Sequence, residues 1–312
     1  MRALITGISG FVGQYLEKRL LKESNMVFGT SRSQRKENNY LCLNLLCEQE
    51  IVHLLKNIRP SHIFHLAGMS NVKQSWTARK HVIEANTSAT INLLEAVKKA
   101  DPNIRVITIG SSEEYGYLGS NQTPISEDSM LQPINPYGVS KAAVSMLVKQ
   151  YYKADHLNVI HLRPFNHIGP GQSLGFVTSD FAYQLALINS KKTENNQMKI
   201  GNLEAIRDFT DVRDIVEAYY QIAMYGKSGE IYNVCRGIGV NIQTILDILL
   251  SFSDIQVETV TDETKMRPSE VSILIGSNQK LLNHISWQPK IPLEKSLYDI
   301  YQFWLSKINQ KL

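Results

Sequence analysis

Short apolar runs alternate with longer amphipathic segments through the first half of the chain. The runs that predict strands are Ala3–Thr6, Met26–Gly29, Ile63–Leu66, Arg105–Ile109 and Val159–Leu162. The segments that predict helices are Phe11–Leu21, Glu48–Ile58, Thr77–Lys99 and Pro136–Lys153. Strands that alternate with helices in this way predict an α/β fold with a doubly wound parallel sheet and right-handed crossovers.

The alternation loosens after Asn166. The glycine-containing stretch Gly169–Gly175 predicts a loop that contacts substrate, Asp211–Tyr225 a further helix and Glu230–Val234 a further strand. The remaining sequence resembles a polar, mixed tail. We therefore predict two interleaved units, a dinucleotide-binding domain at 1–166 and 208–236 and a smaller, C-terminal substrate-binding lobe at 167–207 and 237–312.

Three glycines follow the first predicted strand at intervals of three residues, Gly7, Gly10 and Gly13, and a helix is expected to begin at Phe11. Glycines at a strand-to-helix turn allow a tight turn, let the backbone approach a pyrophosphate, and let the helix pack on the strand. The N–H groups at the start of the helix favour an anion. This pattern predicts a Rossmann-type nucleotide-binding turn.

Tyr137 and Lys141 lie four residues apart, just after Pro136. On a helix that spacing places a phenol and an ammonium on one face. A neighbouring cation favours the phenolate, so we expect Lys141 to lower the pKa of Tyr137 from its ordinary value of about 10. Such a pair suits proton transfer to or from an alcohol or carbonyl oxygen. Tyr-x-x-x-Lys also occurs by chance on many helices, and its weight here comes from the glycine turn.

The composition is that of an ordinary globular protein, with a net charge of +4 and no long basic run. It indicates no nucleic-acid partner and suits a small anionic substrate. The three cysteines and the histidines show no metal-ligand spacing, so we expect no metal site and reduced thiols in a cytoplasmic protein. The sequence shows no signal peptide and no membrane-spanning stretch.

The predicted helices Thr77–Lys99 and Pro136–Lys153 both carry broad apolar faces. One interpretation is packing on the sheet. The other is that a second face of this pair forms the four-helix bundle of a homodimer.

Several motifs together resemble the extended short-chain dehydrogenase/reductase family, and within it the branch that modifies GDP-linked hexoses. The motifs are Gly7-x-x-Gly10-x-x-Gly13, His65-Leu66-Ala67-Gly68, Gly110-Ser111-Ser112-Glu113-Glu114-Tyr115-Gly116, Tyr137-x-x-x-Lys141, Arg163-Pro164-Phe165-Asn166-His167, Gly201-Asn202-Leu203-Glu204-Ala205-x-Arg207-Asp208 and Arg267-Pro268-Ser269-Glu270. The resemblance covers essentially the whole chain.

The resemblance implies NAD(P)H-dependent reduction of the 4-keto group of GDP-4-keto-6-deoxy-D-mannose to GDP-D-rhamnose, an assignment that the Gln172–Thr178 loop favours. The 4,6-dehydration of GDP-mannose is the alternative. Glu113 leaves it open, because 4,6-dehydratases use a glutamate at the matching position to remove the C5 proton, whereas a reductase can use it to bind a sugar hydroxyl. Another nucleotide-sugar dehydratase or epimerase, or a cofactor-binding protein without turnover, is a weaker alternative.

The same resemblance assigns site residues. The catalytic set is Ser111, Tyr137, Lys141 and Glu113. The cofactor set is Gly7, Gly10, Phe11, Val12, Gly13, Ser31, Arg32, Asn44, Leu45, Leu66, Ala67 and Asn86, together with Tyr137 and Lys141. The substrate set is Asn166, Val177, Asn202, Arg207, Arg267 and Glu270. Because Ser31 and Arg32 stand where NAD-specific relatives carry an acid, we expect NADP(H), with NAD(H) tolerated.

Overall fold

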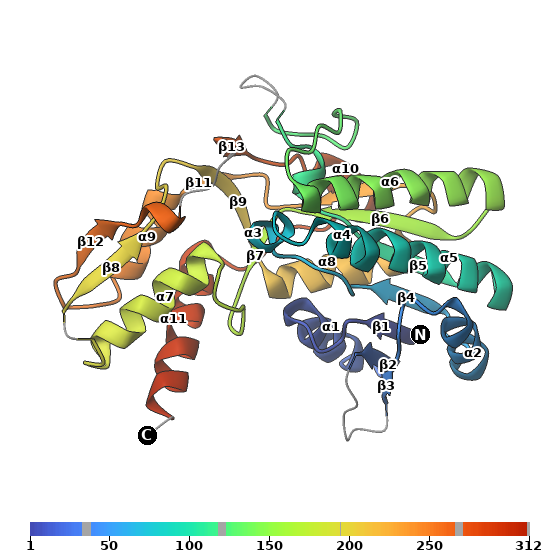
Figure 1. Cartoon of the computed structure of the whole chain (residues 1–312), viewed down its shortest axis with the longest axis horizontal. Coiled ribbons are helices and arrows are strands. Elements are labelled where there is room, and N and C mark those ends of the chain that lie inside the picture. Colours follow the sequence, from blue (N-terminus) through green and yellow to red (C-terminus); the bar gives the residue numbers. More distant parts are fainter. Residues whose placement is uncertain (33–38, 118–122, 194, 266–270, 311–312) are drawn as a thin grey trace.

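A parallel sheet organises the larger part of the molecule. The computed structural model describes residues 1–32, 39–117, 123–193, 195–265 and 271–310. In this part of the chain the sheet has seven strands in the order β10-β6-β5-β4-β1-β2-β3 (Figure 1). Their bounds are β1 Arg2–Thr6, β2 Met26–Ser31, β3 Tyr40–Cys42, β4 His62–His65, β5 Arg105–Ile109, β6 Val159–Pro164 and β10 Ile231–Val234.

The strand order reverses between β1 and β4. After β1 the chain builds β2 and β3 on one side, and from β4 onward it builds β5, β6 and β10 on the other. The two neighbours are in register, with Thr6 opposite His65. In doubly wound sheets, the crevice outside the carboxyl ends of the strands at such a reversal is where ligands bind.

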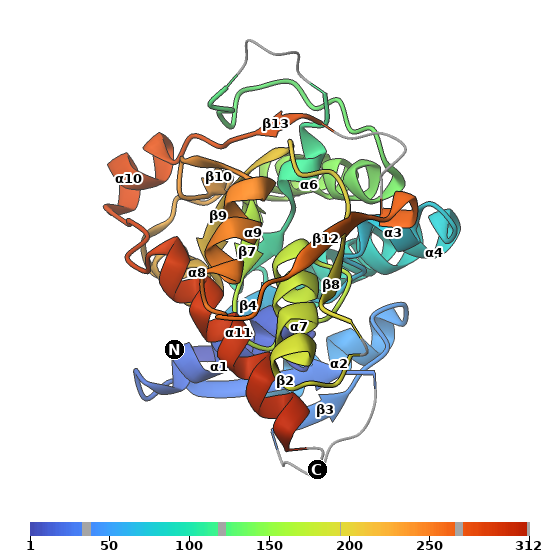
Figure 2. The same cartoon turned by 90° about the vertical axis from the view of Figure 1, so that its left-hand side faces the viewer.

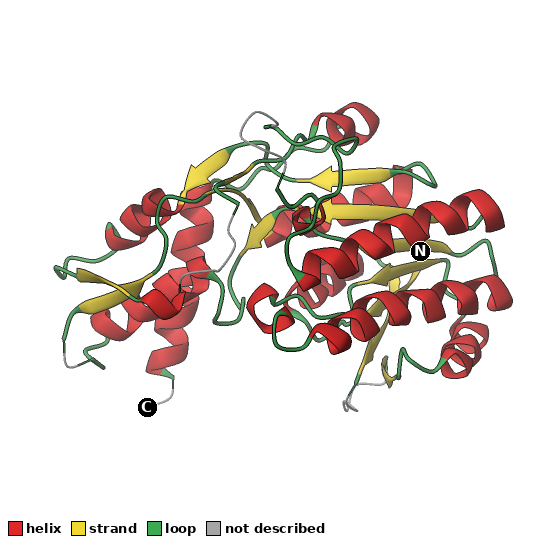
Figure 3. Ribbon diagram, turned by 45° about the horizontal axis from the view of Figure 1, so that its top comes forward, coloured by secondary structure: helices red, strands yellow, loops and turns green. Residues whose placement is uncertain are grey.

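Helices cover both faces of the sheet, as Figure 3 shows. Helices α1 (Phe11–Leu21) and α8 (Val212–Tyr225) bury Leu16, Leu20 and Ile215 against one face. Helices α2 (Glu48–Ile58), α5 (Ala89–Ala100) and α6 (Pro136–Asp155) bury apolar side chains against the other, among them Leu55, Leu93 and Val144. The predicted fold class is confirmed, and the bounds predicted for Phe11–Leu21 and Glu48–Ile58 coincide with α1 and α2.

The helix predicted at Thr77–Lys99 is wrong only in being uninterrupted: the chain is helical from Arg79 to Ala100, with a π-helical turn in between. The structure has the short helices α3 (Val72–Ser75) and α4 (Arg79–Ile83), a π-helical turn at Glu84–Ser88, and then α5. The wide turn carries Asn86, whose buried amide donates to Met69 O at 3.2 Å and accepts from Met69 N at 2.8 Å. Single π turns often occur at functional sites, and this one anchors the loop that follows β4.

A second group of elements lies beyond the carboxyl ends of the sheet, on the left of Figure 1 and toward the viewer in Figure 2. Its helices are α7 (Val177–Asn189), α9 (Ile242–Leu250) and α11 (Leu293–Asn309), and α7 lies beside α11. Its strands are β7 Asn166–Ile168, β8 Gln197–Ile200, β9 Ile206–Asp211, β11 Gly239–Asn241, β12 Glu258–Thr261 and β13 Ile273–Leu274. Strand β8 pairs with β12, and β9 pairs with β7, β11 and β13.

The prediction of a polar, mixed tail is also wrong. Helix α11 buries Leu297, Ile300 and Trp304 in a core shared with α7 and α9. Helix α10 (Gln279–Ile285) packs with the large sheet instead, because its Leu281 lies in the same core as residues of α8 and β10. The division into two interleaved units stays a prediction, and α10 contacts the sheet although its residues fall in the predicted lobe.

Within the described ranges, no helix is both long and apolar enough to cross a bilayer.

Candidate active site

The turn between β1 and α1 is built from main chain. Gly7 has φ +72°, a left-handed conformation, and a Cβ placed on it would lie 2.9 Å from both Cα and N of Ala67. A Cβ on Gly13 would lie 2.6 Å from the carbonyl oxygens of Gly7 and Ile8. Gly10 caps α1 without a side-chain hydrogen bond. The glycines thus let the turn pass close to the β4 loop and leave the N–H groups that begin α1 facing the crevice.

A cavity of about 610 Å³ runs along the carboxyl ends of the strands from this turn to the start of α6. It brings together most of the predicted residues. Lining members of the cofactor and catalytic sets are Gly7, Gly10, Phe11, Val12, Gly13, Ser31, Arg32, Asn44, Leu45, Leu66, Ala67, Ser111, Glu113, Tyr137 and Lys141. Asn166 and Val177 of the substrate set line it too, as do His81, His167 and Phe176.

The cavity fits a dinucleotide on two observations. At Gly7 and Gly13 a Cβ would clash with backbone at 2.9 and 2.6 Å, so only glycine lets this turn close and place the start of α1 on the cavity. Tyr219 on α8 lines the cavity, and its buried hydroxyl has no hydrogen-bond partner among the described residues. A buried polar atom without a partner is uncommon and calls for a ligand or water. The phenol of Tyr219 therefore suits a polar cofactor group, and no motif singled it out.

Ser111, Tyr137 and Lys141 meet at the other end of the cavity. Helix α6 begins at Asn135, whose side chain caps it by accepting from Gly138 N at 2.8 Å. A Cβ on Gly138 would lie 2.4 Å from Glu113 O, so α6 starts directly against the turn after β5. Ser111 and Tyr137 line the same end of the cavity, and Ser111 acts to lower the pKa of the phenol. Lys141 Nζ lies 5.9 Å from the centre of the Tyr137 ring and donates to Ile109 O at 2.7 Å.

Burial determines the protonation of this group. Burial raises the pKa of Tyr137 above its ordinary value, against a lowering by Ser111, while Glu113 and Glu114 raise it further. Burial lowers the pKa of Lys141 to about 8, and Glu114 acts in the opposite direction. The pKa of Tyr137 is raised, not lowered as predicted, because the cost of burying a phenolate exceeds the opposing effect of Ser111. The phenol is protonated at neutral pH.

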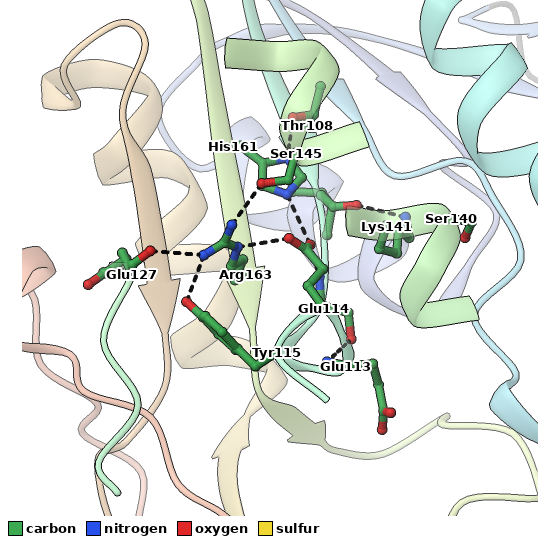
Figure 4. A network of polar contacts seen from close by, with 12 residues as sticks. Thr108, Glu113, Glu114, Tyr115, Glu127, Ser140, Lys141, Ser145, His161 and Arg163 are labelled. Carbon is green, nitrogen blue, oxygen red and sulfur yellow. Dashed lines mark hydrogen bonds and ion pairs between the residues drawn. The ribbon is translucent and has the colours of Figure 1, made fainter. Parts of the chain in front are cut away.

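Glu113 faces the cavity, whereas its neighbour Glu114 points into the protein (Figure 4). Glu113 Oε2 accepts from Asn135 Nδ2 at 2.7 Å, and Glu113 N donates to Ser111 Oγ at 3.1 Å. Because Ser111 Oγ accepts that bond, its own proton stays available for donation toward Tyr137 or a ligand.

Glu114 and Arg163 form a fully buried ion pair behind Ser111, at 2.8 Å between Arg163 Nε and Glu114 Oε2. Glu114 Oε1 accepts from Ser111 N at 2.9 Å. Both residues belong to the family motifs, and no role was predicted for either. The one available signal was a charged residue at the end of an otherwise apolar strand, at Arg163.

The remaining predicted residues lie elsewhere. Asn86 is buried but is not among the described lining residues; it donates to Ser140 Oγ at 2.8 Å and holds the loop at Met69. Arg207, also outside the described lining, donates to the carbonyls of Ile206 and Ser272 at 2.9 and 3.2 Å. Asn202 is exposed on a turn, where its Oδ1 accepts from Glu204 N. Arg267 and Glu270 fall outside the described residues.

The structure contains no cluster of three potential metal ligands within the ranges it describes. His65 has a structural role, since its ring is buried between Thr6 Oγ1 at 2.8 Å and Thr90 Oγ1 at 3.1 Å. Burial, and then Lys141, lower the pKa of His65 to about 3, so the ring is neutral.

A Rossmann-type sheet with a glycine turn at one end of a cavity and a Ser–Tyr–Lys group at the other defines a dinucleotide-dependent class of oxidoreductase fold. Comparison with known proteins gives the family. The chain belongs to the GDP-mannose 4,6 dehydratase family, which it matches over residues 4–300.

Relatives within this family span the whole chain. GDP-6-deoxy-D-mannose reductase of Pseudomonas aeruginosa is 31% identical over 310 residues, covering 99% of each chain. GDP-6-deoxy-D-talose 4-dehydrogenase of Aggregatibacter actinomycetemcomitans is 28% identical over 285 residues, covering 91% of this chain and 90% of the relative. A solved structure of RMD from Pseudomonas aeruginosa complexed with NADPH superposes with a TM-score of 0.88 at 31% identity, covering 98% of this chain and all of that one.

Proposed function

We propose that the protein is an NADPH-dependent reductase that converts GDP-4-keto-6-deoxy-D-mannose to GDP-D-rhamnose. The names of the relatives support a GDP-linked substrate and a change at C4 of a 6-deoxy sugar. Within the molecule, one observation carries the assignment. A phenol that its burial keeps protonated, Tyr137, lines the same end of the cavity as Ser111 and Lys141, and that cavity begins at the glycine turn.

A carbonyl reduction needs a proton donor beside the oxygen that receives charge. Because burial keeps Tyr137 protonated, the phenol is ready to donate to O4 of the keto sugar. The Ser111 hydroxyl, whose oxygen accepts from Glu113 N, donates to the same oxygen as charge develops on it. After transfer, the ammonium of Lys141 on the same helix face offsets the phenolate.

The cofactor would be held along the first part of the cavity. NADPH, when bound, supplies the hydride. The N–H groups that begin α1 would bind its pyrophosphate, and Ser31 with Arg32, at the end of β2, would bind the 2′-phosphate through charge and hydrogen bonds. NADH remains a usable second cofactor in this proposal, because the pyrophosphate site does not depend on Arg32.

The sugar nucleotide would enter from the side of α7. Asn166 and Val177 line that part of the cavity. His167 stacks on Phe11, with ring centroids 6.3 Å apart and planes 8° from parallel, which joins the substrate side to the glycine turn. We keep Asn202, Arg207, Arg267 and Glu270 as proposed contacts for the GDP moiety.

The test is a spectrophotometric assay with two substrates. NADPH absorbance should fall when GDP-4-keto-6-deoxy-D-mannose is added and should stay constant with GDP-mannose. Product analysis by NMR should show the rhamnose configuration at C4. A product with the talose configuration would mean that the hydride reaches the opposite face of C4. Consumption of GDP-mannose to a 4-keto-6-deoxy product without net NADPH use would refute the reductase assignment.

A second candidate, GDP-mannose 4,6-dehydration, is favoured by one observation: the carboxylate of Glu113 lines the cavity next to Ser111. Glu113→Gln separates the two. A dehydratase loses its C5 base and about 10²-fold or more in rate, whereas a reductase keeps its rate within about threefold, because the amide still binds a sugar hydroxyl. Asn135→Ser is the matched control, since it removes the amide that donates to Glu113 Oε2 and keeps a side-chain oxygen that can cap α6.

We further propose that the protein is a cytoplasmic homodimer joined by the helices near α4 and α6. Met146 and Val139 on α6 are 60% and 45% exposed, and Ile83 on α4 is 39% exposed. A surface hollow beside them is lined by Trp76, Pro133 and Ile134.

The described cysteines are all free, which suits the proposed cytoplasmic, reducing compartment. The test of the dimer is a measurement of mass. Light scattering should give a dimer mass, and Met146→Lys should yield a monomer.

A further inference from the structure

We infer that Glu114 is a positioning residue, whose carboxylate holds the main chain at Ser111 so that the Ser111 hydroxyl meets the Tyr137 phenol. The inference deepens the proposed function and rests on it, because it assigns the residue that fixes one of the proposed catalytic groups.

The Glu114 carboxylate is shared between the active-site turn and two residues of β6 (Figure 4). Its Oε1 accepts from Ser111 N at 2.9 Å and from His161 Nε2 at 3.0 Å. Its Oε2 accepts from Arg163 Nε at 2.8 Å. The side chains of Glu114, His161 and Arg163 are all fully buried. One carboxylate therefore links the backbone N–H of Ser111 to the middle and the end of a central strand.

The hydrogen-bond chain behind Glu114 fixes its orientation. Burial lowers the pKa of His161, so its ring is neutral. Its Nε2 carries the hydrogen and donates it in the bond to the Glu114 carboxylate, which can only accept. The second ring nitrogen, Nδ1, lies 2.8 Å from Thr108 Oγ1 on β5. Arg163 also donates to Tyr115 OH at 2.9 Å, Ser145 Oγ at 2.8 Å and Glu127 O at 3.2 Å. Partners from β5, α6 and neighbouring loops therefore hold both ends of the ion pair.

The turn is held from the opposite side by a catalytic residue. Lys141 Nζ donates to Ile109 O at 2.7 Å. Ile109 lies two residues before Ser111, whose backbone N–H donates to Glu114. A Cβ on Gly110, the residue between them, would lie 2.0 Å from Glu114 Oε1 and 2.3 Å from His161 Nε2. The carboxylate and imidazole thus lie directly against the backbone of the turn, which leaves Ser111 little freedom to move.

Stability alone does not account for a buried pair at this place. Burying two charges costs desolvation, and well-packed apolar residues of similar size often stabilise a core as well or better. An apolar side chain at 114 would fill the same volume, yet it would leave Ser111 N without this acceptor. What the carboxylate supplies is a fixed backbone under Ser111 Oγ, and Ser111 lines the same end of the cavity as Tyr137.

The inference is tested by a double-mutant cycle on the full-length protein. Glu114→Gln should lower kcat by about 10²-fold, because small misplacements of catalytic groups cost that much. The KM and the NADPH Kd, measured by fluorescence titration, should stay within about threefold. In a Ser111→Ala background, Glu114→Gln should cause no further loss beyond about twofold, since residues that act as one unit are not additive. Losses that multiply in the double variant overturn the inference.

A second variant guards against a folding defect. Glu114→Leu combined with Arg163→Met removes both charges, so no unpaired ion is buried. It should keep its Tm within a few degrees of the wild-type value and bind NADPH, and still lose about 10²-fold in kcat. Glu95→Gln is the matched control, because Glu95 accepts from Tyr151 OH across α5 and α6 away from the site, and its kcat should stay unchanged. Wild-type kcat in the apolar double variant refutes the positioning role.

A measurement without turnover separates this inference from the proposed function. Exchange of the Ser111 amide with deuterium, followed by NMR, should be at least about tenfold faster in Glu114→Gln and in the apolar double variant than in the wild type. If the wild-type enzyme does not reduce the keto sugar, the proposed function is wrong and this readout still tests Glu114. Unchanged Ser111 exchange contradicts the role of Glu114 whatever the substrate is.

Discussion

The two ends of the cavity are built in opposite ways. At the glycine turn the cavity wall is main chain, and Gly7 and Gly13 leave no space for a Cβ. At the start of α6 the wall is made of buried side chains, and the pKa values of Tyr137 and Lys141 are both shifted toward the neutral forms. Binding of an anion needs oriented N–H groups close to the ligand. Proton transfer needs ionisable groups that are kept out of water.

Because of this difference, substitutions at the two ends of the cavity should disrupt the protein in different ways. A backbone cradle carries no ionisable group, so its failure mode is steric. The catalytic end carries buried charges that cost stability, so its failure modes are chemical and electrostatic. The following changes test this contrast, beginning with the largest expected effect.

Tyr137→Phe should lower kcat by about 10³-fold, because it removes the proposed proton donor and leaves the ring in place. The NADPH Kd should change by less than about threefold, since the glycine end is untouched. Steady-state kinetics and fluorescence titration measure the two quantities. Tyr151→Phe on the same helix is the control and should retain its rate. A Tyr137→Phe enzyme with wild-type turnover would remove the phenol from the mechanism.

Gly7→Ala should weaken NADPH binding by about 10²-fold or destabilise the fold, because its Cβ would lie 2.9 Å from the Ala67 backbone. The matched control is Gly171→Ala. Gly171 has a positive φ of +89°, and a Cβ there meets nothing within 4 Å in the described structure. The control should show only the strain of a left-handed residue, about 1–2 kcal/mol in urea unfolding. Equal effects of the two substitutions would contradict the steric account of the glycine end.

Lys141→Met should stabilise the ligand-free protein at neutral pH while it abolishes most turnover. Folding lowers the pKa of Lys141 from 10.5 to about 8, so between these values the unfolded state binds more protons and stability rises with pH. The shift corresponds to about 3 kcal/mol of destabilisation below pH 8 that disappears by about pH 10.5. Urea unfolding at several pH values should show the Met variant ahead at pH 7 and its advantage shrinking toward pH 10. A constant difference across that range would contradict burial of the ammonium.

Arg32→Ala should reduce the preference for NADPH over NADH by about tenfold, the value of one charge-assisted hydrogen bond. Arg32 is exposed at the rim of the cavity, so its effect should be the smallest of the four. The ratio of the two Kd values measures it, with Arg79→Ala, near α4, as the control. An unchanged ratio would assign the 2′-phosphate to other groups.

Much of the fold was predictable because its signals are local. The strand-to-helix turn at Gly7 and the helices Phe11–Leu21 and Glu48–Ile58 depend on residues a few positions apart. Helix α11 was overlooked although Leu293, Leu297, Ile300 and Trp304 follow helical spacing. Strands such as β3 and β13 have only three and two residues. They were not predicted, because pairing with a distant strand rather than any local periodicity makes them strands.

The candidate site divides in the same manner. The sequence by itself determined the candidate residues for the chemistry, since the glycine spacing and the Tyr137–Lys141 spacing are properties of one turn and one helix. Only the tertiary structure decided that Glu114 meets Arg163, 49 residues away, behind Ser111. It also decided that Tyr137 holds its proton, because the pKa of a phenol depends on how much water surrounds it. Burial is a property of the folded packing, and no residue spacing encodes it directly.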